Sequence, residues 1–198
     1  MIVFPEDLVL EDERVILSPL MEKDLEHLLV YAVNEPETWI YSLISPAGRH
    51  GIKKYIADAI AQRKAKKEYP FIVFDKHTKS FAGCTRFYDI QLDNLTTQLG
   101  YTWYGKNFRR TGLNRHCKLL MLGYAFEKWG MERVEFRADA RNQASIRAMQ
   151  DIGCTVEGIL RSNCVIASGG RRDSIILSIL KAEWFENVKE TVVSKIKR

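Results

Sequence analysis

Hydrophobic and polar positions alternate with two different periods along the chain, and together they predict a mixed α/β protein. Short apolar runs with two-residue alternation, rich in aromatic and β-branched residues, indicate strands. Apolar residues spaced three and four apart indicate helices, which end at glycine or before proline. The predicted strands span residues 14–20, 69–74, 81–90, 96–104, 133–138, 155–161 and 173–180. The predicted helices span residues 23–34, 51–66, 113–129 and 142–152, and an amphipathic tail begins at residue 181.

The order of these elements predicts how the strands pair. Residues 75–80 are polar and typical of a hairpin turn, and the strand at 96–104 continues an antiparallel run. The strand at 133–138 follows a strand and a helix, so we expect it to lie parallel to the strand at 96–104. The aromatic segment 37–50 has no period, and core packing of its rings is favoured over a role as floor or lid of a substrate site.

The stretch from Gln98 to Trp129 combines a strand, a short basic turn and a helix. The first amides of a helix have no partners inside the helix, and the helix dipole places partial positive charge there, so such a turn suits an anion. Gly112 allows close backbone approach, while Arg109 and Arg110 supply charge and paired donors suited to phosphate. No Lys-Ser or Lys-Thr follows the glycine, which excludes an ATP-binding P-loop. The stretch predicts either a pyrophosphate cradle or a solvated basic loop.

Composition narrows the class of protein. With 198 residues, 46% hydrophobic and 28% charged, the chain suffices for one well-buried domain, which we expect over residues 1–198 with a helical tail at 181–198. Its four cysteines form no C-x-x-C pair, so neither a disulfide framework nor a metal site is expected. The chain begins without a signal segment and holds no apolar run of membrane-spanning length. These features predict a cytoplasmic protein without a membrane partner.

The net charge of +5 could indicate nucleic acid, but its distribution does not. Six basic residues between positions 53 and 67 gather near one predicted helix end, where basic side chains are favourable without any ligand. The remaining basic residues are scattered among acids, so no direct nucleic-acid binding is expected. A polyanionic cofactor at the turn accounts better for the excess charge.

A motif follows each of the two predicted parallel strands. The first is Arg109-x-x-Gly112-x-Asn114, and the second, after strand 133–138, is Arg141-Asn142-Gln143-Ala144-Ser145. With the element order, they resemble the GNAT family of acyl-CoA-dependent N-acetyltransferases over residues 12–186. Three further strings are similar to the RimJ/RimL branch, the ribosomal-protein N-terminal acetyltransferase-like group: Ile152-Gly153-Cys154, Val156-Glu157-Gly158-Ile159-Leu160-Arg161 and Arg172-Asp173-Ser174.

This resemblance implies an α+β fold with a mixed, mostly antiparallel sheet of six or seven strands, splayed between the fourth and fifth and flanked by helices on both faces. Acetyl-CoA would lie in the gap as co-substrate. The backbone of Trp103 and Tyr104 would pair with the pantetheine amides, while Asn142 and Ser145 would contact the pantetheine arm. The pyrophosphate would be held by Arg109, Arg110, Thr111, Gly112, Leu113 and Asn114. Family members usually carry Gly or Ala in place of Asn114, a change that is tolerable if the asparagine side chain points away.

The catalytic acid of many family members has no counterpart here. Their tyrosine, seven residues after the motif asparagine, is replaced by Met149, which cannot donate a proton. Ser145 becomes the candidate acid, with pantetheine orientation or helix capping as its alternative role. An acid is less necessary for a thiol, whose pKa of roughly 8.5 makes the thiolate a fair leaving group. The histidines at 27, 50, 77 and 116 show no partner pattern and receive no chemical role.

The general base is predicted from the carboxylates that remain. Many relatives carry an acid where this chain has Gln98, which leaves Glu135 as the candidate base for a primary amine. The alternative is an exposed Glu135 that only pairs with Arg133 or Arg137. Glu157 on the following strand is a second carboxylate.

The expected acceptor follows from the cost of deprotonating an amine. At pH 7 an α-amine with a pKa of about 8 costs on the order of 1 kcal/mol, whereas a lysine amine costs roughly 4 or more. A weakly equipped site therefore predicts direct acetyl transfer to a protein or peptide N-terminus in a ternary complex. Acetylation of a small amine, such as an amino acid, polyamine or antibiotic, and a non-catalytic acyl-CoA sensor stay as alternatives. Dimers are common in this branch, so a homodimer is also open.

Overall fold

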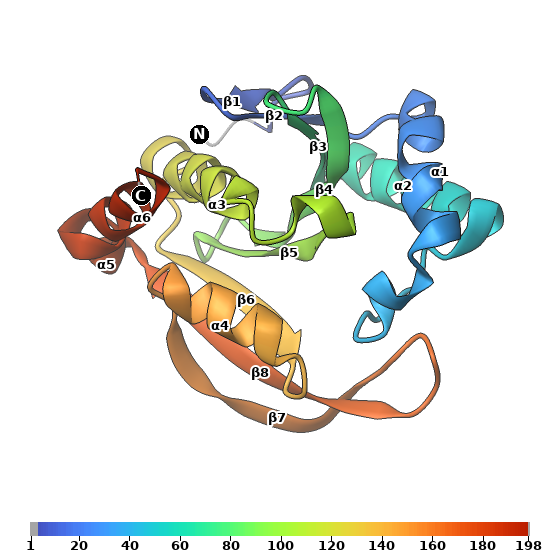
Figure 1. Ribbon diagram of the computed structural model, residues 1–198. Coiled ribbons are helices and arrows are strands. Elements are labelled where there is room, and N and C mark those ends of the chain that lie inside the picture. The colour runs from blue at the N-terminus through green and yellow to red at the C-terminus, as the bar shows by residue number, and fades with distance from the viewer. Residues whose placement is uncertain (1–3, 198) are drawn as a thin grey trace.

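A single mixed sheet organises the protein (Figure 1). The computed structural model describes residues 4–197, so residues 1–3 and 198 of the predicted domain lie outside it. The strand order is β1-β2-β3-β4-β5-β6-β8-β7. The strands are β1 (Leu10–Glu11), β2 (Val15–Pro19), β3 (Tyr69–Asp75), β4 (Ser80–Gln91), β5 (Thr96–Tyr104), β6 (Arg133–Asp139), β7 (Thr155–Val165) and β8 (Arg171–Leu180). The prediction of six or seven strands is wrong by one, because two-residue β1 is too short to leave an alternating pattern.

Helices cover both faces of the sheet, as predicted. The α-helices are α1 (Leu25–Asn34), α2 (Gly48–Lys64), α3 (Leu113–Gly123), α4 (Gln143–Asp151), α5 (Lys181–Glu183) and α6 (Lys189–Ile196). Two neighbouring residues of β5 show this arrangement. Trp103 packs with residues of α1 and α2, whereas Tyr104 packs with residues of α3 on the opposite face. None of the helices within residues 4–197 has the length and apolar character needed to cross a membrane.

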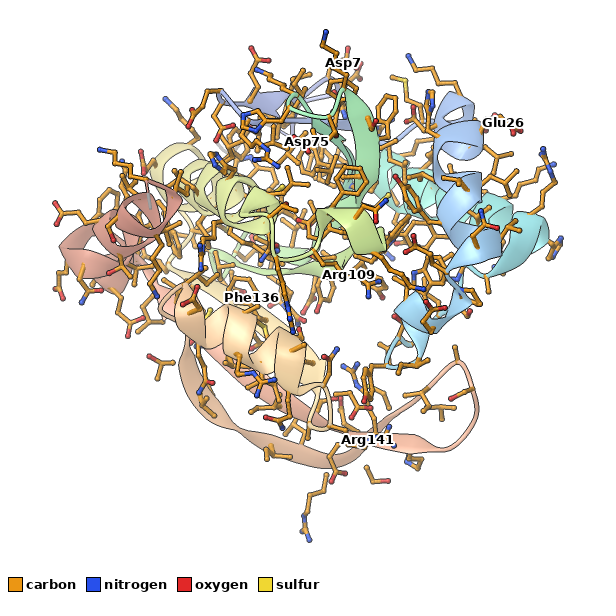
Figure 2. All side chains as sticks on the ribbon, in the orientation of Figure 1. Asp7, Glu26, Asp75, Arg109, Phe136 and Arg141 are labelled. Atoms are coloured by element: carbon orange, nitrogen blue, oxygen red, sulfur yellow. The ribbon has the colours of Figure 1, made fainter. Side chains whose placement is uncertain are left out.

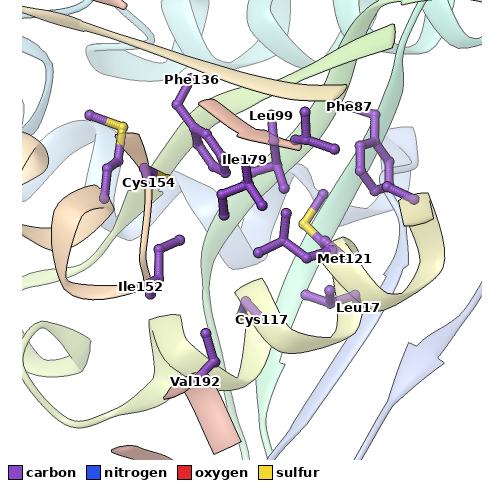
Figure 3. Packing of buried hydrophobic residues seen from close by; sticks show 14 of the residues in the cluster. Leu17, Phe87, Leu99, Cys117, Met121, Phe136, Ile152, Cys154, Ile179 and Val192 are labelled. Carbon is purple, nitrogen blue, oxygen red and sulfur yellow. The ribbon is translucent and has the colours of Figure 1, made fainter. Parts of the chain in front are cut away.

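The main core lies between the sheet and helices α3, α4 and α6. Figure 3 shows Cys117 and Met121, one turn apart on α3, packed among side chains of the sheet that include Leu99 and Phe136. All four are nearly or fully buried. Burying a side chain of this size stabilises the fold by roughly 1.5–3 kcal/mol, so this contact fixes α3 against β5 and β6.

β5 and β6 separate along their length, as the resemblance implied. Among the strands of residues 4–197 they are the one parallel pair, as predicted, and they share three register pairs: Thr96 with Arg133, Thr97 with Val134 and Gln98 with Glu135. β5 continues for six residues beyond Gln98 without pairing to β6. A bulge at Tyr101, whose φ is 48°, interrupts the β4–β5 register at the same level. The sheet is therefore open between the two strands.

Several predicted boundaries shift for local reasons. The helix predicted over residues 113–129 is an α-helix to Gly123 and then a π-turn over Tyr124–Lys128, in which the amide of Trp129 donates to the carbonyl of Tyr124. The predicted strand over residues 155–161 extends to Val165, because a bulge around Ser162 lets pairing with β8 resume. Figure 1 shows the resulting long β7–β8 hairpin reaching toward the segment after α1.

Candidate active site

The basic turn between β5 and α3 presents free backbone donors. A 3-10 turn over Lys106–Phe108 precedes it, and both Arg110 (φ 61°) and Gly112 (φ 88°) have left-handed backbone conformations. A side chain at Gly112 would meet no atom within 4 Å, so the glycine serves the backbone angle rather than the space. The amides of residues 110–112 form no hydrogen bond with any other residue between 4 and 197. Consecutive free amides at a helix start form a concavity suited to phosphate.

The two arginines of this turn have different surroundings. The Nε of Arg109 donates to the Tyr104 carbonyl at 3.0 Å, and its Nη2 donates to Thr38 Oγ1 at 2.7 Å. Arg109 therefore ties the turn to β5 and to the segment after α1, and Figure 2 shows it beside the opening. Arg110 is exposed and takes part in no ion pair with the described part of the chain. Its guanidinium is thus the one left free for a ligand.

Asn114, at the start of α3, directs its side chain to β5. Its Oδ1 accepts a hydrogen bond from the hydroxyl of Tyr104 at 3.1 Å. Burial raises the pKa of Tyr104 well above its usual value, so the phenol stays protonated and remains a donor. The asparagine side chain is thus engaged with β5, while Leu113 beside it is fully buried.

The turn between β6 and α4 forms the second motif. Asn142 caps α4, because its Oδ1 accepts from the amide of Ser145 at 3.1 Å. The alternative that Ser145 itself is the helix cap is therefore wrong, since its amide is the capped group. The Ser145 hydroxyl is half-buried and has no hydrogen-bond partner within residues 4–197. Met149, one turn further along α4, lies in the main core.

The base of the opening holds the predicted carboxylate. Glu135 lies in register with Gln98, with its side chain 16% exposed. One carboxylate oxygen accepts from Arg133 Nη2 at 3.1 Å and the other from Arg137 Nε at 2.6 Å. The alternative interpretation of pairing is thus observed with both arginines. To accept a proton from an amine, Glu135 must use a remaining lone pair or release one guanidinium.

A carboxylate that the sequence did not single out lies beside Gln98. Asp89 Oδ2 accepts from Gln98 Nε2 at 2.7 Å, and the buried Gln98 Oε1 has no partner in the described residues. Asp89 occupies a bulge of β4 with a φ of 47°. The register between β4 and β5 places Asp89 next to Gln98. Because that register depends on the bulge, the sequence alone does not reveal the contact. An acid therefore stands next to Gln98, the position at which the resemblance implied an acid in many family members.

Two tyrosine side chains cover the sheet near Gln98, the register partner of Glu135. Tyr88 is in register with Gln98, and its ring covers Gly100, the second residue of β5 beyond the last pair with β6. Tyr88 also contacts Tyr101 edge-to-face at 5.1 Å, and burial raises the pKa of Tyr88. A pocket of about 390 Å³ adjoins this wall, lined by Gln62, Lys67, Glu68, Tyr88, Asp89 and Ile90. The face therefore carries a hollow beside Tyr88 and Asp89 of β4.

The segment predicted as core, floor or lid contributes a ring to the core and also contacts the β7–β8 loop. Trp39 is buried and contacts Trp103 edge-to-face at 5.3 Å, which confirms core packing for this ring. Further along, the carbonyl of Ser42 accepts from the amide of Ala167 in the β7–β8 loop at 3.1 Å. The segment and the hairpin therefore form one connected rim, consistent with their proximity in Figure 1.

His116 has a partner that its sequence context did not reveal. Its Nδ1 lies 2.7 Å from Asp12 Oδ2, and Glu13 is nearby, so the three side chains bring their ligand atoms within 4.8 Å of one another. The sequence showed no partner pattern for His116, because Asp12 is 104 positions away in the chain. All four cysteines have free thiols, and Cys84, Cys117 and Cys154 are buried.

Comparison with known proteins identifies the family. A family model described as an acetyltransferase (GNAT) domain matches residues 14–155, a range that includes both motifs and the opening between β5 and β6. The chain belongs to the GNAT acetyltransferases. This family takes the acetyl group from acetyl-CoA, so the protein is an acyltransferase, and the alternative of a non-catalytic sensor is not retained.

Individual relatives agree with this assignment. The uncharacterised N-acetyltransferase p20 of Bacillus licheniformis is 25% identical over 176 residues, which cover 87% of this chain and 96% of p20. YdaF of Bacillus subtilis, named as a candidate ribosomal N-acetyltransferase, is 29% identical over 105 residues, 53% of this chain and 56% of YdaF. A candidate acetyltransferase from T. thermophilus has a crystal structure similar at a TM-score of 0.87 and 28% identity, covering 98% of this chain and 99% of that chain.

Proposed function

We propose that this GNAT enzyme acetylates the α-amine of a protein or peptide N-terminus, by direct attack on acetyl-CoA in a ternary complex. The observation that carries the proposal is the state of the acids at the base of the opening. Both oxygens of Glu135 already accept from arginines, and Asp89 accepts from Gln98. Acids engaged in this way assist deprotonation weakly, which favours an α-amine over a lysine amine because the α-amine has the lower pKa.

The residues around the opening fit acetyl-CoA. The free amides of 110–112 and the unpaired Arg110 suit its pyrophosphate. The edge of β5 beyond Gln98 offers unpaired backbone groups to the two amides of pantetheine. The Ser145 hydroxyl lies at the start of α4 and would contact the pantetheine arm. Burial of Cys84, Cys117 and Cys154 disfavours an acetyl-cysteine intermediate.

In the proposed reaction the amine enters on the face that carries Tyr88 and Glu135. The amine loses a proton to Glu135, directly or through a water molecule, and its nitrogen attacks the thioester carbonyl. The carbon–sulfur bond then breaks with its electron pair on sulfur, the nitrogen gives up its remaining extra proton to solvent, and the CoA thiolate takes up one proton and leaves as the thiol. The similarity to YdaF, whose name assigns it ribosomal acceptors, supports a protein N-terminus and the RimJ/RimL branch. The pocket whose lining includes Lys67, Glu68 and Asp89 favours, as a second candidate, a small amine.

Release of CoA thiol over a panel of acceptors tests the proposal. The panel contains N-terminal peptides, peptides with only a lysine amine, polyamines, amino acids and aminoglycosides. We expect the highest kcat/KM with an N-terminal peptide. Preference for a polyamine or other small amine would replace this acceptor class by the second candidate, and absence of a thermal shift with acetyl-CoA or CoA would contradict the cofactor site.

The Glu135→Gln variant tests the base, with Glu157→Gln as its matched control. We expect Glu135→Gln to lower kcat/KM by about 10²-fold at pH 7. The loss should narrow toward pH 9, because solvent then deprotonates the amine without help. Glu157 lies on β7 and also pairs with Arg133, so its variant disturbs the same arginine without removing the proposed base. Equal losses in the two variants, or a loss that does not change with pH, would contradict the role of Glu135.

A further inference from the structure

Lys118 is a buried lysine on the α3 side of the opening. It lies in the middle of α3 with only 5% of its surface exposed. Its Nζ donates to Thr102 Oγ1 at 3.1 Å, and Thr102 shares a further hydrogen bond with Thr85 at 2.8 Å. Thr102 belongs to the part of β5 that no longer pairs with β6. The ammonium group is therefore held against the open edge of β5.

The ammonium group of Lys118 also lies near β6, the second strand that borders the opening. Its Nζ lies 5.8 Å from the ring centre of Phe136, and Phe136 follows Glu135, the last residue of β6 paired with β5. The ammonium thus lies between the two strands close to where they begin to separate. The free amides of residues 110–112 precede the same helix, so a ligand bound along the opening passes from those amides toward Lys118.

Lys118 has no acidic partner in the described part of the chain. Of its three donors, one is used by Thr102, and no carboxylate of residues 4–197 forms an ion pair with it. The titratable groups that face it are Cys117 on its own helix and Cys154 before β7. Burial raises the pKa of Cys117 to about 11 and that of Cys154 to about 12, so both thiols are neutral near pH 7. A buried cation without a counter-charge is costly, which indicates that it serves a ligand.

Cys154 also locates Lys118 relative to α4. The amide of Cys154 donates to the carbonyl of Met149 at 3.1 Å. Met149, which cannot donate a proton, lies on α4 in the main core. Lys118 therefore faces Cys154, which follows shortly after the helix that carries Met149.

We propose that Lys118 is the catalytic proton donor to the departing CoA thiolate, an inference that rests on the proposed function. When the amine attacks the thioester carbon, a carbon–nitrogen bond forms and the carbon–sulfur bond breaks with its electron pair on sulfur. Nζ then gives one proton to that sulfur, which leaves as the thiol. The proton released by the attacking amine reprotonates Lys118 through solvent, so the charges balance over one turnover.

The proton affinities agree with this step. Desolvation by burial lowers the pKa of Lys118 to about 8 from its ordinary value of 10.5. A thiol has a pKa of roughly 8.5, so proton transfer from the lysine to the thiolate is nearly balanced. Only the protonated lysine can donate, and the rate should therefore fall as the pH rises through about 8.

The decisive experiment compares wild type with Lys118→Met, using the acceptor that gives the highest rate in the panel. We expect kcat to fall by about 10²-fold, the low end for a general acid since a thiolate leaves readily. KM for acetyl-CoA and the thermal shift with CoA should change less than about threefold. The descending limb near pH 8 should disappear from the kcat profile, and Tm should hold or rise because an unpaired buried charge has been removed.

Two further variants separate proton transfer from a structural role. Thr102→Val removes the hydroxyl that favours the charged lysine, so it should move the descending limb to lower pH without abolishing it. Lys128→Met changes an exposed lysine beyond the same helix and should leave the profile unaltered. An unchanged kcat and pH profile in Lys118→Met would overturn the inference while leaving the proposed function intact. If wild type itself neither binds CoA nor releases thiol, the proposed function fails first.

Discussion

The two sides of the opening between β5 and β6 differ in how fully their polar groups are paired. On the α3 side, the amides of residues 110–112 and two donors of Lys118 have no acceptor among residues 4–197. On the opposite side, both oxygens of Glu135 accept from arginines, and Asp89 accepts from Gln98. The protein thus keeps donors free where an anionic ligand and a leaving thiolate need them, while its acids are already engaged. Such a site favours acceptors whose amine loses its proton easily.

The largest expected effect concerns β5, the strand that borders the opening and pairs with β4. A Cβ built at Gly83 lies 2.0 Å from the Trp103 carbonyl oxygen, so Gly83→Ala must displace β5 from β4. We expect a loss of more than about 3 kcal/mol in the free energy of unfolding, measured by urea titration. Gly112→Ala is the control, because its Cβ meets no atom and costs only the left-handed backbone, about 1 kcal/mol. Equal losses would show that β5 is not held by this close contact.

The pH dependence of stability tests whether Lys118 is an unpaired buried cation. Its pKa is about 8 in the folded protein and about 10.5 in the unfolded chain, so the unfolded chain binds more protons between these values. The free energy of unfolding contributed by this residue therefore rises with pH from about 8 to 10.5. Lys118→Met should lack that rise and be more stable at pH 7 by up to about 3 kcal/mol. If the variant is less stable than wild type and keeps the same pH dependence, Lys118 is not an unpaired buried cation.

The two arginines of the turn should separate ligand binding from folding. Arg110→Ala should raise KM for acetyl-CoA by about tenfold, the loss of one charge-assisted contact, without changing Tm. Arg109→Ala also removes hydrogen bonds to Tyr104 and Thr38, so it should lower Tm as well. Enzyme kinetics and thermal melting of both variants measure this difference. Identical behaviour of the two variants would contradict the distinction between a free and a committed arginine.

The smallest expected effect tests Glu135, whose carboxylate oxygens both accept hydrogen bonds from arginines. Arg137→Gln removes the guanidinium 2.6 Å from Glu135 Oε1 and leaves the contact with Arg133. A carboxylate with one oxygen freed should accept the amine proton more readily, so kcat/KM at pH 7 should rise about two- to fivefold. A decrease would mean that Arg137 itself binds the acceptor or the cofactor.

The sequence predicted the architecture where information is local. The turn at residues 109–114 and the parallel pair of β5 and β6 were accessible from hydrophobic period, glycine and element order, whereas the opening between the two strands was implied by the resemblance to the GNAT family. β1 was missed because two residues carry no period. The boundaries of α3 and β7 shifted because a π-turn and a bulge alter hydrogen bonding without altering composition.

The chemical details were less accessible because they depend on contacts across the sheet. Asp89 reaches Gln98 only through a bulge in β4, and His116 meets Asp12 from the other half of the chain. Lys118 could have been noticed from its spacing, since it lies four residues before buried Leu122 on a helix. Its lack of an acidic partner within residues 4–197, however, is a property of the assembled core.

Hydrogen–deuterium exchange with and without CoA tests the central claim most directly. If CoA lies in the opening between β5 and β6, the amides of residues 110–112 and of β5 beyond Gln98 should gain protection together with those at the start of α4. The amides of β2 and β3, on the far side of the sheet order, should not change. Binding of CoA that leaves the amides of residues 110–112 and 99–104 as exchangeable as before would contradict the account.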